Sequence, residues 1–343
     1  MRAAWYERRG RPRDVLVVGE MPDPVPGPGE VRIAIAVSGL SPGDVKKRAG
    51  WQGSPMSYPR VIPHSDGAGT IDAVGSGVSG GRVGERVWCY GAQSYRPFGT
   101  AAEYVVVPGA LAVALPRPGA AGGPTEDTRE FADGLEEQAA CLGIAGITAH
   151  RAVFADGPVR GLVVLVHGAA GGVGSIATQL ARRDGGTVLA VVRDEAQRST
   201  ATRLGAQHAF LHDDPALAER IRQAAPDGVH RIAEVDLAAH ADLDAEILAV
   251  GGVISSYYSA ADRPAIPYWA LGFKDTTLRL LGSDDFPATV KAAAAGTLTG
   301  ALLDGSLRTD ITARFPLDQV ASAHELVESG ARGRVVIDVT PPG

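Results

Sequence analysis

Cysteine is nearly absent from this chain of 343 residues, which contains only Cys89 and Cys141. Two cysteines cannot build a disulfide framework, and they are too few for a four-cysteine zinc site. Hydrophobic runs are short as well, and none reaches the roughly 18 residues of a membrane span. The first residues, Met1–Glu7, contain no hydrophobic segment of signal-peptide length. These absences predict a cytoplasmic protein that does not enter a membrane.

The chain also lacks an excess of positive charge. Its formal net charge is −6, with 33 Lys and Arg residues against 39 Asp and Glu residues. A negative net charge opposes non-specific binding to nucleic acids and to anionic membranes, so neither is an expected partner. Hydrophobic residues at 45% and charged residues at 21% are ordinary for a globular protein. At this length, two domains are the default expectation.

The most informative stretch is an apolar run, Val163–Val166, that leads through a glycine-dense turn into a helical pattern. A strand, a glycine turn and a helix together can hold a pyrophosphate on the backbone N–H groups at the helix N-terminus. The first glycine position of this fingerprint is occupied by Ala169. The residues predicted to bind the pyrophosphate are Ala170, Gly171, Gly172, Val173 and Gly174. A plain strand-to-helix turn is the alternative interpretation.

Strands and helices alternate on both sides of this turn. Helical segments separate most of six apolar runs, which are Val163–Val166, Val188–Val192, Ala209–Leu211, Ile232–Val235, Val253–Ser255 and Leu278–Leu281. This order predicts an α/β fold with right-handed βαβ units and a doubly wound parallel sheet of about six strands. We assign residues 135–284 to this Rossmann dinucleotide-binding domain.

The remainder of the chain predicts a β-rich domain made of two segments. Strands are expected at Val15–Val18, Val31–Val37, Thr70–Val74 and Ala102–Val107, with a short helix at Val45–Ala49. The Pro/Gly-rich and acidic stretch from Pro116 to Gly134 is typical of a surface loop or linker. The tail returns to complete the first domain, so residues 1–134 and 285–343 are predicted to form one discontinuous domain.

The end of the second strand of the sheet predicts which dinucleotide binds. A site for NAD places Asp or Glu there, where it accepts a hydrogen bond from the ribose 2′-OH. This chain has Arg193 instead, with Arg198 in the following helix. A cation suits a 2′-phosphate, so NADPH is the predicted cofactor. Because Asp194 and Glu195 follow immediately, a merely solvated Arg193 remains the alternative.

Five pieces of sequence occur in a characteristic order, namely Ser41–Gly50, Pro63–Gly69, Gly84–Val87, Gly99–Tyr104 and Ala169–Gly174. Together they resemble the medium-chain dehydrogenase/reductase superfamily, and within it the zinc-free quinone oxidoreductase branch that includes zeta-crystallin. The resemblance runs from Met1 to about Val339 and implies that the β-rich domain is a GroES-like catalytic domain. The stretch 116–134 looks like an insertion relative to that branch.

The resemblance also bears on metal binding. Relatives that bind zinc place Cys, His and Cys where this chain has Ser41, Ser65 and a residue near Ala145. Serine and alanine supply no thiolate, imidazole or carboxylate ligand, so no metal is expected. His64, next to one of these positions, is expected to be a packed or hydrogen-bonded histidine.

Without zinc, the resemblance implies hydride transfer from NADPH to an electron-poor acceptor, such as a quinone or an α,β-unsaturated carbonyl compound. Candidate donors to the substrate oxygen are Ser41, Lys46 and Tyr58. Relatives commonly carry Asn and Tyr at the first two positions, so this pocket departs from theirs. An enoyl-thioester or 2-enal reductase is the alternative activity. A catalytically silent NADPH-binding or structural protein is the alternative of another class.

Further contacts with the cofactor are implied elsewhere in the chain. Thr148 matches a Thr-Ala pair that contacts the cofactor in relatives, and Arg334 matches a Gly-Lys/Arg pair near the end of the family pattern. Residues after the fourth and fifth strands lie where a doubly wound sheet binds its ligand, and we predict binding by Leu237, Ala238, Ser255 and Tyr257. Leu278–Gly282 resembles the edge strand through which the family dimerises, so a homodimer is expected.

Overall fold

The computed structural model describes residues 1–116 and 134–339, and the chain divides into two compact units. The first comprises Met1–Ile144, Ala295–Asp304 and Arg308–Gly343, and the second comprises Ala145–Ala294 and Gly305–Leu307. Most of the predicted surface loop, residues 117–133, lies outside the described residues.

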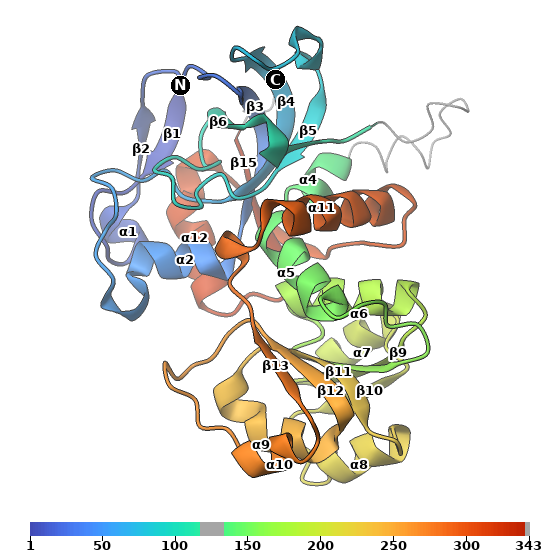
Figure 1. Cartoon of the computed structure of the whole chain (residues 1–343). Coiled ribbons are helices and arrows are strands. Elements are labelled where there is room, and N and C mark those ends of the chain that lie inside the picture. The colour runs from blue at the N-terminus through green and yellow to red at the C-terminus, as the bar shows by residue number, and fades with distance from the viewer. Residues whose placement is uncertain (117–133, 340–343) are drawn as a thin grey trace. The chain divides into compact units, whose positions relative to one another are not determined.

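The second unit is built on a six-stranded sheet in the order β10-β9-β8-β11-β12-β13 (Figure 1). All neighbouring strands run parallel. The strands are β8 (Val163–His167), β9 (Thr187–Val192), β10 (His208–Leu211), β11 (Val229–Glu234), β12 (Leu248–Ser256) and β13 (Thr277–Leu280). The predicted doubly wound parallel sheet is therefore confirmed, and its strand order reverses between β8 and β11.

Helices connect the strands of this sheet. They are α5 (Gly143–Phe154), α6 (Gly172–Arg183), α7 (Glu195–Arg203), α8 (Leu217–Ala224), α9 (Leu237–Ile247) and α10 (Tyr268–Gly272). Apolar side chains of α8 and α9, such as Ile221 and Ala241, pack on the strand residues Leu189 and Ile254 in one buried cluster. Helix α9 ends at Ile247, and Leu248 already begins β12.

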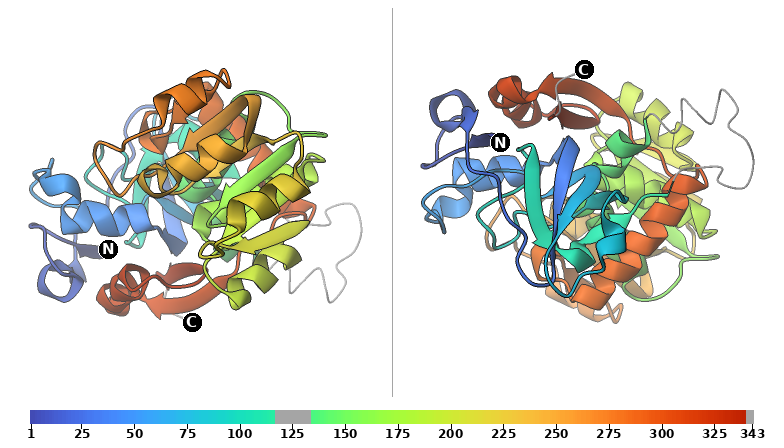
Figure 2. Two further views of the ribbon diagram at one scale, coloured as in Figure 1. Left: turned by 90° about the horizontal axis from the view of Figure 1, so that it is seen from below. Right: turned by 90° about the horizontal axis from the view of Figure 1, so that it is seen from above.

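The first unit contains a seven-stranded sheet and a two-stranded sheet, β1-β2. In the larger sheet the order is β14-β15-β3-β4-β5-β7, and β6 also pairs with β3. The strands are β1 (Arg2–Trp5), β2 (Val17–Glu20), β3 (Glu30–Leu40), β4 (Asp66–Val74), β5 (Arg86–Cys89), β6 (Tyr104–Pro108), β7 (Ala112–Ala114), β14 (Ile311–Pro316) and β15 (Arg334–Asp338). Strand β15 returns from the C-terminal part of the chain and pairs antiparallel with β3, with Val335 opposite Leu40 (Figure 2).

The described helices of the first unit are α1 (Pro12–Val15), α2 (Pro42–Ala49), α4 (Leu135–Ala139), α12 (Val320–Glu328) and the part of α11 (Ala288–Leu303) from Ala295 onward. The prediction of a strand over Val15–Val18 is wrong at Val15, because Pro12 starts a helical turn there. Helix α4 packs against β3 and β4, so the first unit continues beyond the boundary predicted after residue 134. The indole of the fully buried Trp88 donates a hydrogen bond to Thr299 of α11 (3.0 Å).

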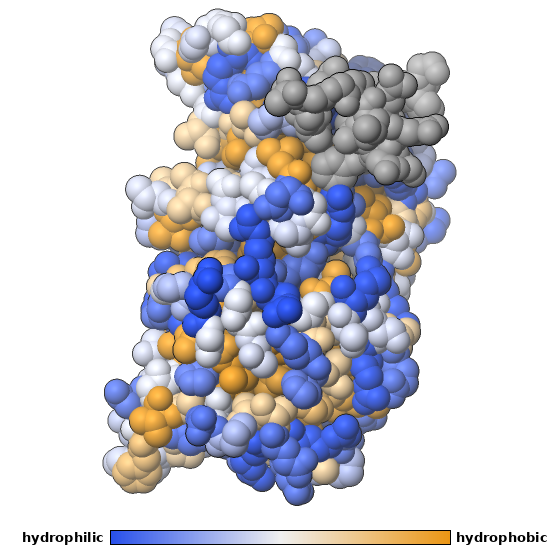
Figure 3. Space-filling view, turned by 90° about the vertical axis from the view of Figure 1, so that its right-hand side faces the viewer, coloured by the Kyte–Doolittle hydropathy of each residue, from blue (hydrophilic) through white to orange (hydrophobic). Residues whose placement is uncertain are grey.

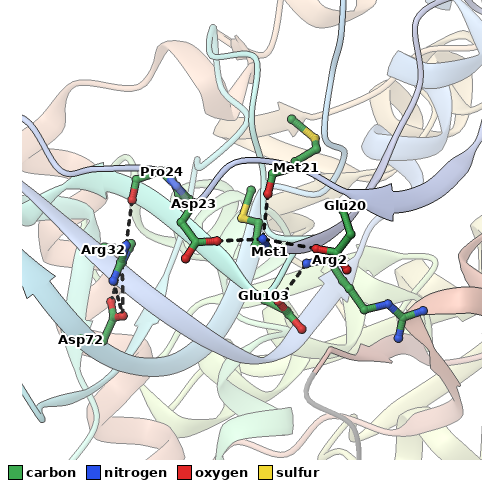
Figure 4. Close-up of polar contacts among 9 residues, drawn as sticks. All are labelled: Met1, Arg2, Glu20, Met21, Asp23, Pro24, Arg32, Asp72 and Glu103. Atoms are coloured by element: carbon green, nitrogen blue, oxygen red, sulfur yellow. Dashed lines mark hydrogen bonds and ion pairs between the residues drawn. The ribbon is translucent and has the colours of Figure 1, made fainter.

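Polar contacts join the N-terminal residues to neighbouring segments of the first unit (Figure 4). The amino group of Met1 donates to the Asp23 carboxylate (2.7 Å), and the backbone N–H of Arg2 donates to Glu103 (2.8 Å). Across β3 and β4, the Arg32 guanidinium binds both carboxylate oxygens of Asp72. These contacts join segments that lie far apart in the sequence.

Among the described residues, no helix combines the length and the hydrophobicity needed to cross a bilayer. On the face drawn in Figure 3, hydrophobic residues form separate patches among hydrophilic ones.

Candidate functional site

The glycine turn after β8 has the geometry of a phosphate-binding loop. Gly168 has φ +64°, in the left-handed region that glycine adopts without strain. Gly171 is extended (φ −85°, ψ 177°) and precedes the first residue of α6. Its N–H donates to the carbonyl oxygen of Gly168 (2.8 Å), which closes the turn.

Position 174 needs a residue without a side chain, because α6 lies very close to this turn. A Cβ atom on Gly174 would lie 2.2 Å from the carbonyl oxygen of Gly168, far inside van der Waals contact. A Cβ atom on Gly171 would lie 3.1 Å from the same oxygen. The absence of a side chain at Gly174 therefore permits the close packing of α6 against the turn after β8.

The N-terminus of α6 is suited to hold an anion. Gly171 has no side chain to cap this helix of 12 residues, and it is exposed to solvent. The backbone N–H groups of Gly172, Val173 and Gly174 occupy the first helical turn, where the helix dipole favours negative charge. A pyrophosphate fits this helix N-terminus, because no capping side chain competes for the N–H groups.

The three charged residues that follow β9, Arg193, Asp194 and Glu195, differ in their polar partners. Arg193 is exposed, and in the part of the chain that the structure describes its guanidinium makes no ion pair. Asp194 is the N-cap of α7 and accepts from the N–H of Gln197 (3.0 Å). Glu195 pairs with Arg198 (3.0 Å). Both carboxylates therefore have other partners, and Arg193 is the group left to meet a phosphate.

The other predicted cofactor residues of the second unit occupy strand ends or a helix. Leu237 begins α9, Ala238 follows it on the surface, and Thr148 is buried in α5. The N–H of Tyr257 donates to the carbonyl oxygen of Glu234 (3.1 Å), which joins the ends of β12 and β11. The hydroxyl of Ser255 is buried and has no hydrogen-bond partner among the described residues.

Arg334 lies in the first unit, where it contacts a predicted catalytic residue. Its guanidinium is buried and donates to the hydroxyl oxygen of Ser41 (3.1 Å). It also contacts the thiol of Cys141; burial raises the pKa of this thiol, and the Arg334 charge opposes the rise. The Nε atom of Arg334 is buried without a hydrogen-bond partner in the described structure. The sequence predicted neither the pairing with Ser41 nor the one with Cys141.

The other two predicted catalytic side chains have separate surroundings. The Lys46 ammonium lies 5.4 Å from the centroid of the Trp51 ring, within range of a cation–π contact. The Tyr58 hydroxyl donates to the backbone carbonyl of Tyr95 (2.5 Å). A substrate oxygen would therefore compete with this carbonyl for the Tyr58 proton.

The positions that hold zinc in some relatives carry different chemistry in this chain. Ser41 bonds Arg334, and Ser65 is fully buried. The neighbouring Asp66 carboxylate accepts from the N–H of Ile144 at the start of α5 (2.8 Å). In the described part of the first unit, no three His, Cys, Asp or Glu side chains gather around a common point. The buried guanidinium of Arg334 would also repel a metal cation there.

Purified protein is expected to contain no stoichiometric zinc at these positions. The measurement is metal analysis by inductively coupled plasma mass spectrometry after gel filtration. One zinc per chain that disappears in a Ser41→Ala or Asp66→Asn variant would contradict the expectation.

His64 forms part of a buried hydrogen-bonded chain, as predicted. Its Nδ1 lies 2.8 Å from the Ser38 hydroxyl, and its Nε2 lies 3.0 Å from Nε2 of His324. Burial lowers the pKa of His64 to about 3, so the ring is neutral. Only one of the two facing nitrogens can then carry a proton.

A second polar cluster lies beneath the glycine turn and is not among the predicted site residues. It contains His167 and Glu234, which end β8 and β11. A polar residue that directly follows apolar residues at the end of a strand, as His167 follows Val166 and Glu234 follows Ala233, is the sequence signal that could have identified both.

Comparisons with known proteins cover both units. Residues 27–117 match the family described as an alcohol dehydrogenase GroES-like domain, and residues 172–293 match the one described as a zinc-binding dehydrogenase. A quinone oxidoreductase from Rattus norvegicus is 30% identical, over 98% of this chain and 97% of the relative.

Solved structures with the same fold also match along the whole chain. An NAD-dependent alcohol dehydrogenase has a TM-score of 0.82 at 25% identity, covering 99% of this chain and 100% of the other. A mycobacterial protein solved in complex with NADPH has a TM-score of 0.82 at 26% identity, with the same coverage. The fold is thus shared by proteins described with either dinucleotide.

Proposed function

Because this chain belongs to the quinone oxidoreductase (zeta-crystallin-like) branch of the medium-chain dehydrogenase/reductase superfamily, we propose that this oxidoreductase uses NADPH to reduce quinones or related conjugated carbonyl compounds without a catalytic metal. The observation that carries the choice of cofactor is the guanidinium of Arg193, which has no ion-pair partner among the described residues, beside two carboxylates that already have partners. The NADPH complex of the mycobacterial protein supports the same choice.

The chain has residues suited to two parts of the dinucleotide, the pyrophosphate and the 2′-phosphate. The N–H groups of Gly172, Val173 and Gly174 would hold the pyrophosphate, and Arg193 would meet the 2′-phosphate. When bound, NADPH supplies the hydride, and the protein contributes orientation and electrostatics. Arg198, held against Glu195, would add positive charge beside the same phosphate.

Ser41 is the strongest candidate to donate to the substrate oxygen. Its hydroxyl oxygen already accepts a hydrogen bond from the charged guanidinium of Arg334, so its own proton remains to be donated. A charge-assisted bond of this kind makes the hydroxyl a better donor to an oxygen that gains negative charge. Arg334 therefore acts through Ser41 in this proposal, as a positioning residue, rather than on the cofactor.

The test is NADPH oxidation with three substrate panels: quinones, 2-enals and crotonyl-type thioesters. We expect turnover with quinones or enals, and a loss of most of kcat in Ser41→Ala. Turnover with thioesters alone would favour the alternative activity. NADPH binding without turnover on any panel would indicate the silent binding protein instead.

We further propose that the protein forms a homodimer through the edge strand β13. Among the described strands, β13 pairs with β12 alone, so its outer edge is open. Exposed apolar side chains lie on and near it, with exposed fractions of 72% for Leu280, 70% for Trp269 and 81% for Phe273. An open edge flanked by apolar surface favours pairing with a second copy.

Sedimentation velocity should find a dimer for the wild type and a monomer for Leu280→Lys. Val25→Lys is the matched control, because Val25 is an equally exposed apolar residue of the first unit (82%). A monomeric wild type, or a Leu280→Lys variant that stays dimeric, would exclude this interface.

A further inference from the structure

Four side chains form a polar cluster beneath the glycine turn of the second unit. His167 ends β8, Glu234 ends β11, and His240 and Asp244 lie on α9. His167, Glu234 and Asp244 are at most 1% exposed, and only His240 reaches the surface. The Nε2 atom of His167 lies 2.8 Å from Asp244 and 3.3 Å from Glu234, and His240 Nδ1 lies 2.9 Å from Glu234.

The ring geometry argues against a metal ion in this cluster, although two imidazoles and a carboxylate are a common ligand set. The rings of His167 and His240 are stacked, with centroids 4.2 Å apart and planes 6° from parallel. A metal ion binds an imidazole nitrogen close to the plane of the ring. One ion cannot lie in two parallel planes, so these rings do not converge on a common ion.

A proton shared by Glu234 and Asp244 explains the arrangement of their carboxyl groups better than a metal ion does. Glu234 Oε2 and Asp244 Oδ2 are buried, and in the described structure no protein donor hydrogen-bonds to either. Both carboxyl groups meet at the same nitrogen of His167, so they lie close together. Two ionised carboxylates in such a place repel each other, and one proton between them removes the repulsion. Burial raises the pKa of Asp244 to about 7, in the direction that retains this proton.

Of the titratable groups that face this proton, His167 and Tyr257 keep their protonation state near neutral pH, whereas His240 also titrates there. From β8, burial lowers the pKa of His167 to about 4, so its ring is neutral. From α9, burial lowers the pKa of His240, but the hydrogen bond to Glu234 and the charges of Glu234, Asp244 and Asp236 raise it further, so the pKa is raised overall. After β12, burial and the Glu234 charge raise the pKa of the Tyr257 phenol, which stays protonated.

The cluster joins two turns that border the cofactor cradle. His167 is followed directly by Gly168, the first residue of the glycine turn. The Glu234 carboxylate accepts from the backbone N–H of Asp236, and the Glu234 carbonyl accepts from the N–H of Tyr257 (3.1 Å). Any movement of Glu234 relative to His167 therefore moves the β11–α9 turn relative to the β8–α6 turn.

We propose that His167, Glu234, His240 and Asp244 form a positioning unit that holds these two turns in the geometry that binds the dinucleotide, through one proton shared by the two carboxyl groups. The inference rests on the proposed use of NADPH and adds a pH dependence to it. Loss of the proton leaves adjacent buried charges, so the turns separate and affinity falls as the pH rises above neutrality.

The test measures the dissociation constant for NADPH by fluorescence titration between about pH 6 and pH 9, set around the Asp244 pKa of about 7. We expect the wild-type value to rise severalfold above neutrality. Asp244→Asn, which keeps the shape and carries no titratable proton, should reduce this rise and leave only the contribution of His240. Asp242→Asn is the matched control, because Asp242 is exposed on the same helix. It should keep the wild-type profile.

A second readout works without cofactor. Because the folded pKa of Asp244 is raised, its stabilising effect is present at low pH and is lost as the pH rises from about 4 to about 7. The melting temperature of the wild type should therefore fall relative to that of Asp244→Asn across this interval. If Asp244→Asn does not fold, Glu234→Gln is measured in its place.

The outcomes separate this inference from the proposed function. Failure of the wild type to bind NADPH at any pH would defeat the proposed function, while the melting curves would still test the shared proton. Parallel pH profiles in the wild type and Asp244→Asn would overturn the positioning unit. Stoichiometric metal that is lost in Glu234→Gln would also overturn it, in favour of a metal site.

Discussion

Replacing Arg193 by glutamate should weaken NADPH binding by about 1–3 kcal/mol, the range of a lost charge-assisted hydrogen bond. This corresponds to a rise of roughly fivefold to 150-fold in the dissociation constant. The physical reason is local: Arg193 directly follows β9 without an ion-pair partner among the described residues, and a carboxylate there would repel the 2′-phosphate. Fluorescence titration with NADPH and NADH measures the change.

The same substitution should leave NADH binding nearly unchanged or improve it, because a carboxylate can accept from the ribose 2′-OH. Arg222→Glu is the matched control. It makes the same change of charge on α8, where Arg222 pairs with Glu246. An unaltered preference for NADPH over NADH in Arg193→Glu would remove Arg193 from the site.

Replacing Gly174 by alanine should destabilise the protein by about 1–3 kcal/mol, the scale of overpacking in a close-packed region. The new Cβ atom would meet backbone, the carbonyl oxygen of Gly168 at 2.2 Å, so no flexible side chain can move aside. Helix α6 must then shift, and its first N–H groups lose their alignment with the pyrophosphate. We expect at least a tenfold loss of affinity for NADPH, with stability measured by urea unfolding.

Gly296→Ala provides the control for this prediction. Gly296 lies in α11, and a Cβ atom there would meet nothing within 4 Å. Alanine in a helix interior should therefore stabilise the protein by about 0.5–1 kcal/mol and leave NADPH affinity unchanged. Equal stability and affinity in Gly174→Ala and the wild type would show that α6 tolerates the displacement.

Much of the fold could be predicted because its signals are local. Apolar runs such as Val188–Val192 coincide with strands of the parallel sheet, and the order of strands and helices fixes the doubly wound topology. The strands that were missed, β1, β5 and β7, have three or four residues each. Strands this short lack a periodicity of their own and exist because neighbouring strands pair with them.

The site residues also fall into two groups, those that a local sequence pattern identifies and those that only long-range contacts bring together. The glycine turn and Arg193 lie within one strand–helix–strand unit, so spacing alone identifies them as candidates. The contact between Arg334 and Ser41 joins residues 293 positions apart, and no local pattern predicts it. The cluster around Glu234 was missed for a similar reason, because it depends on the register of β8 beside β11.

The pairing of β15 with β3 has a consequence for the order in which the protein can fold during synthesis. The chain of the second unit, Ala145–Ala294, leaves the ribosome before β14 and β15 exist. The parallel sheet can therefore fold on the nascent chain. The residues of β3 that pair with β15, Val37–Leu40, lack this partner until β15 has been synthesised. An unpaired strand edge can pair with another chain, so the newly made first unit is exposed to intermolecular pairing until β15 has been synthesised.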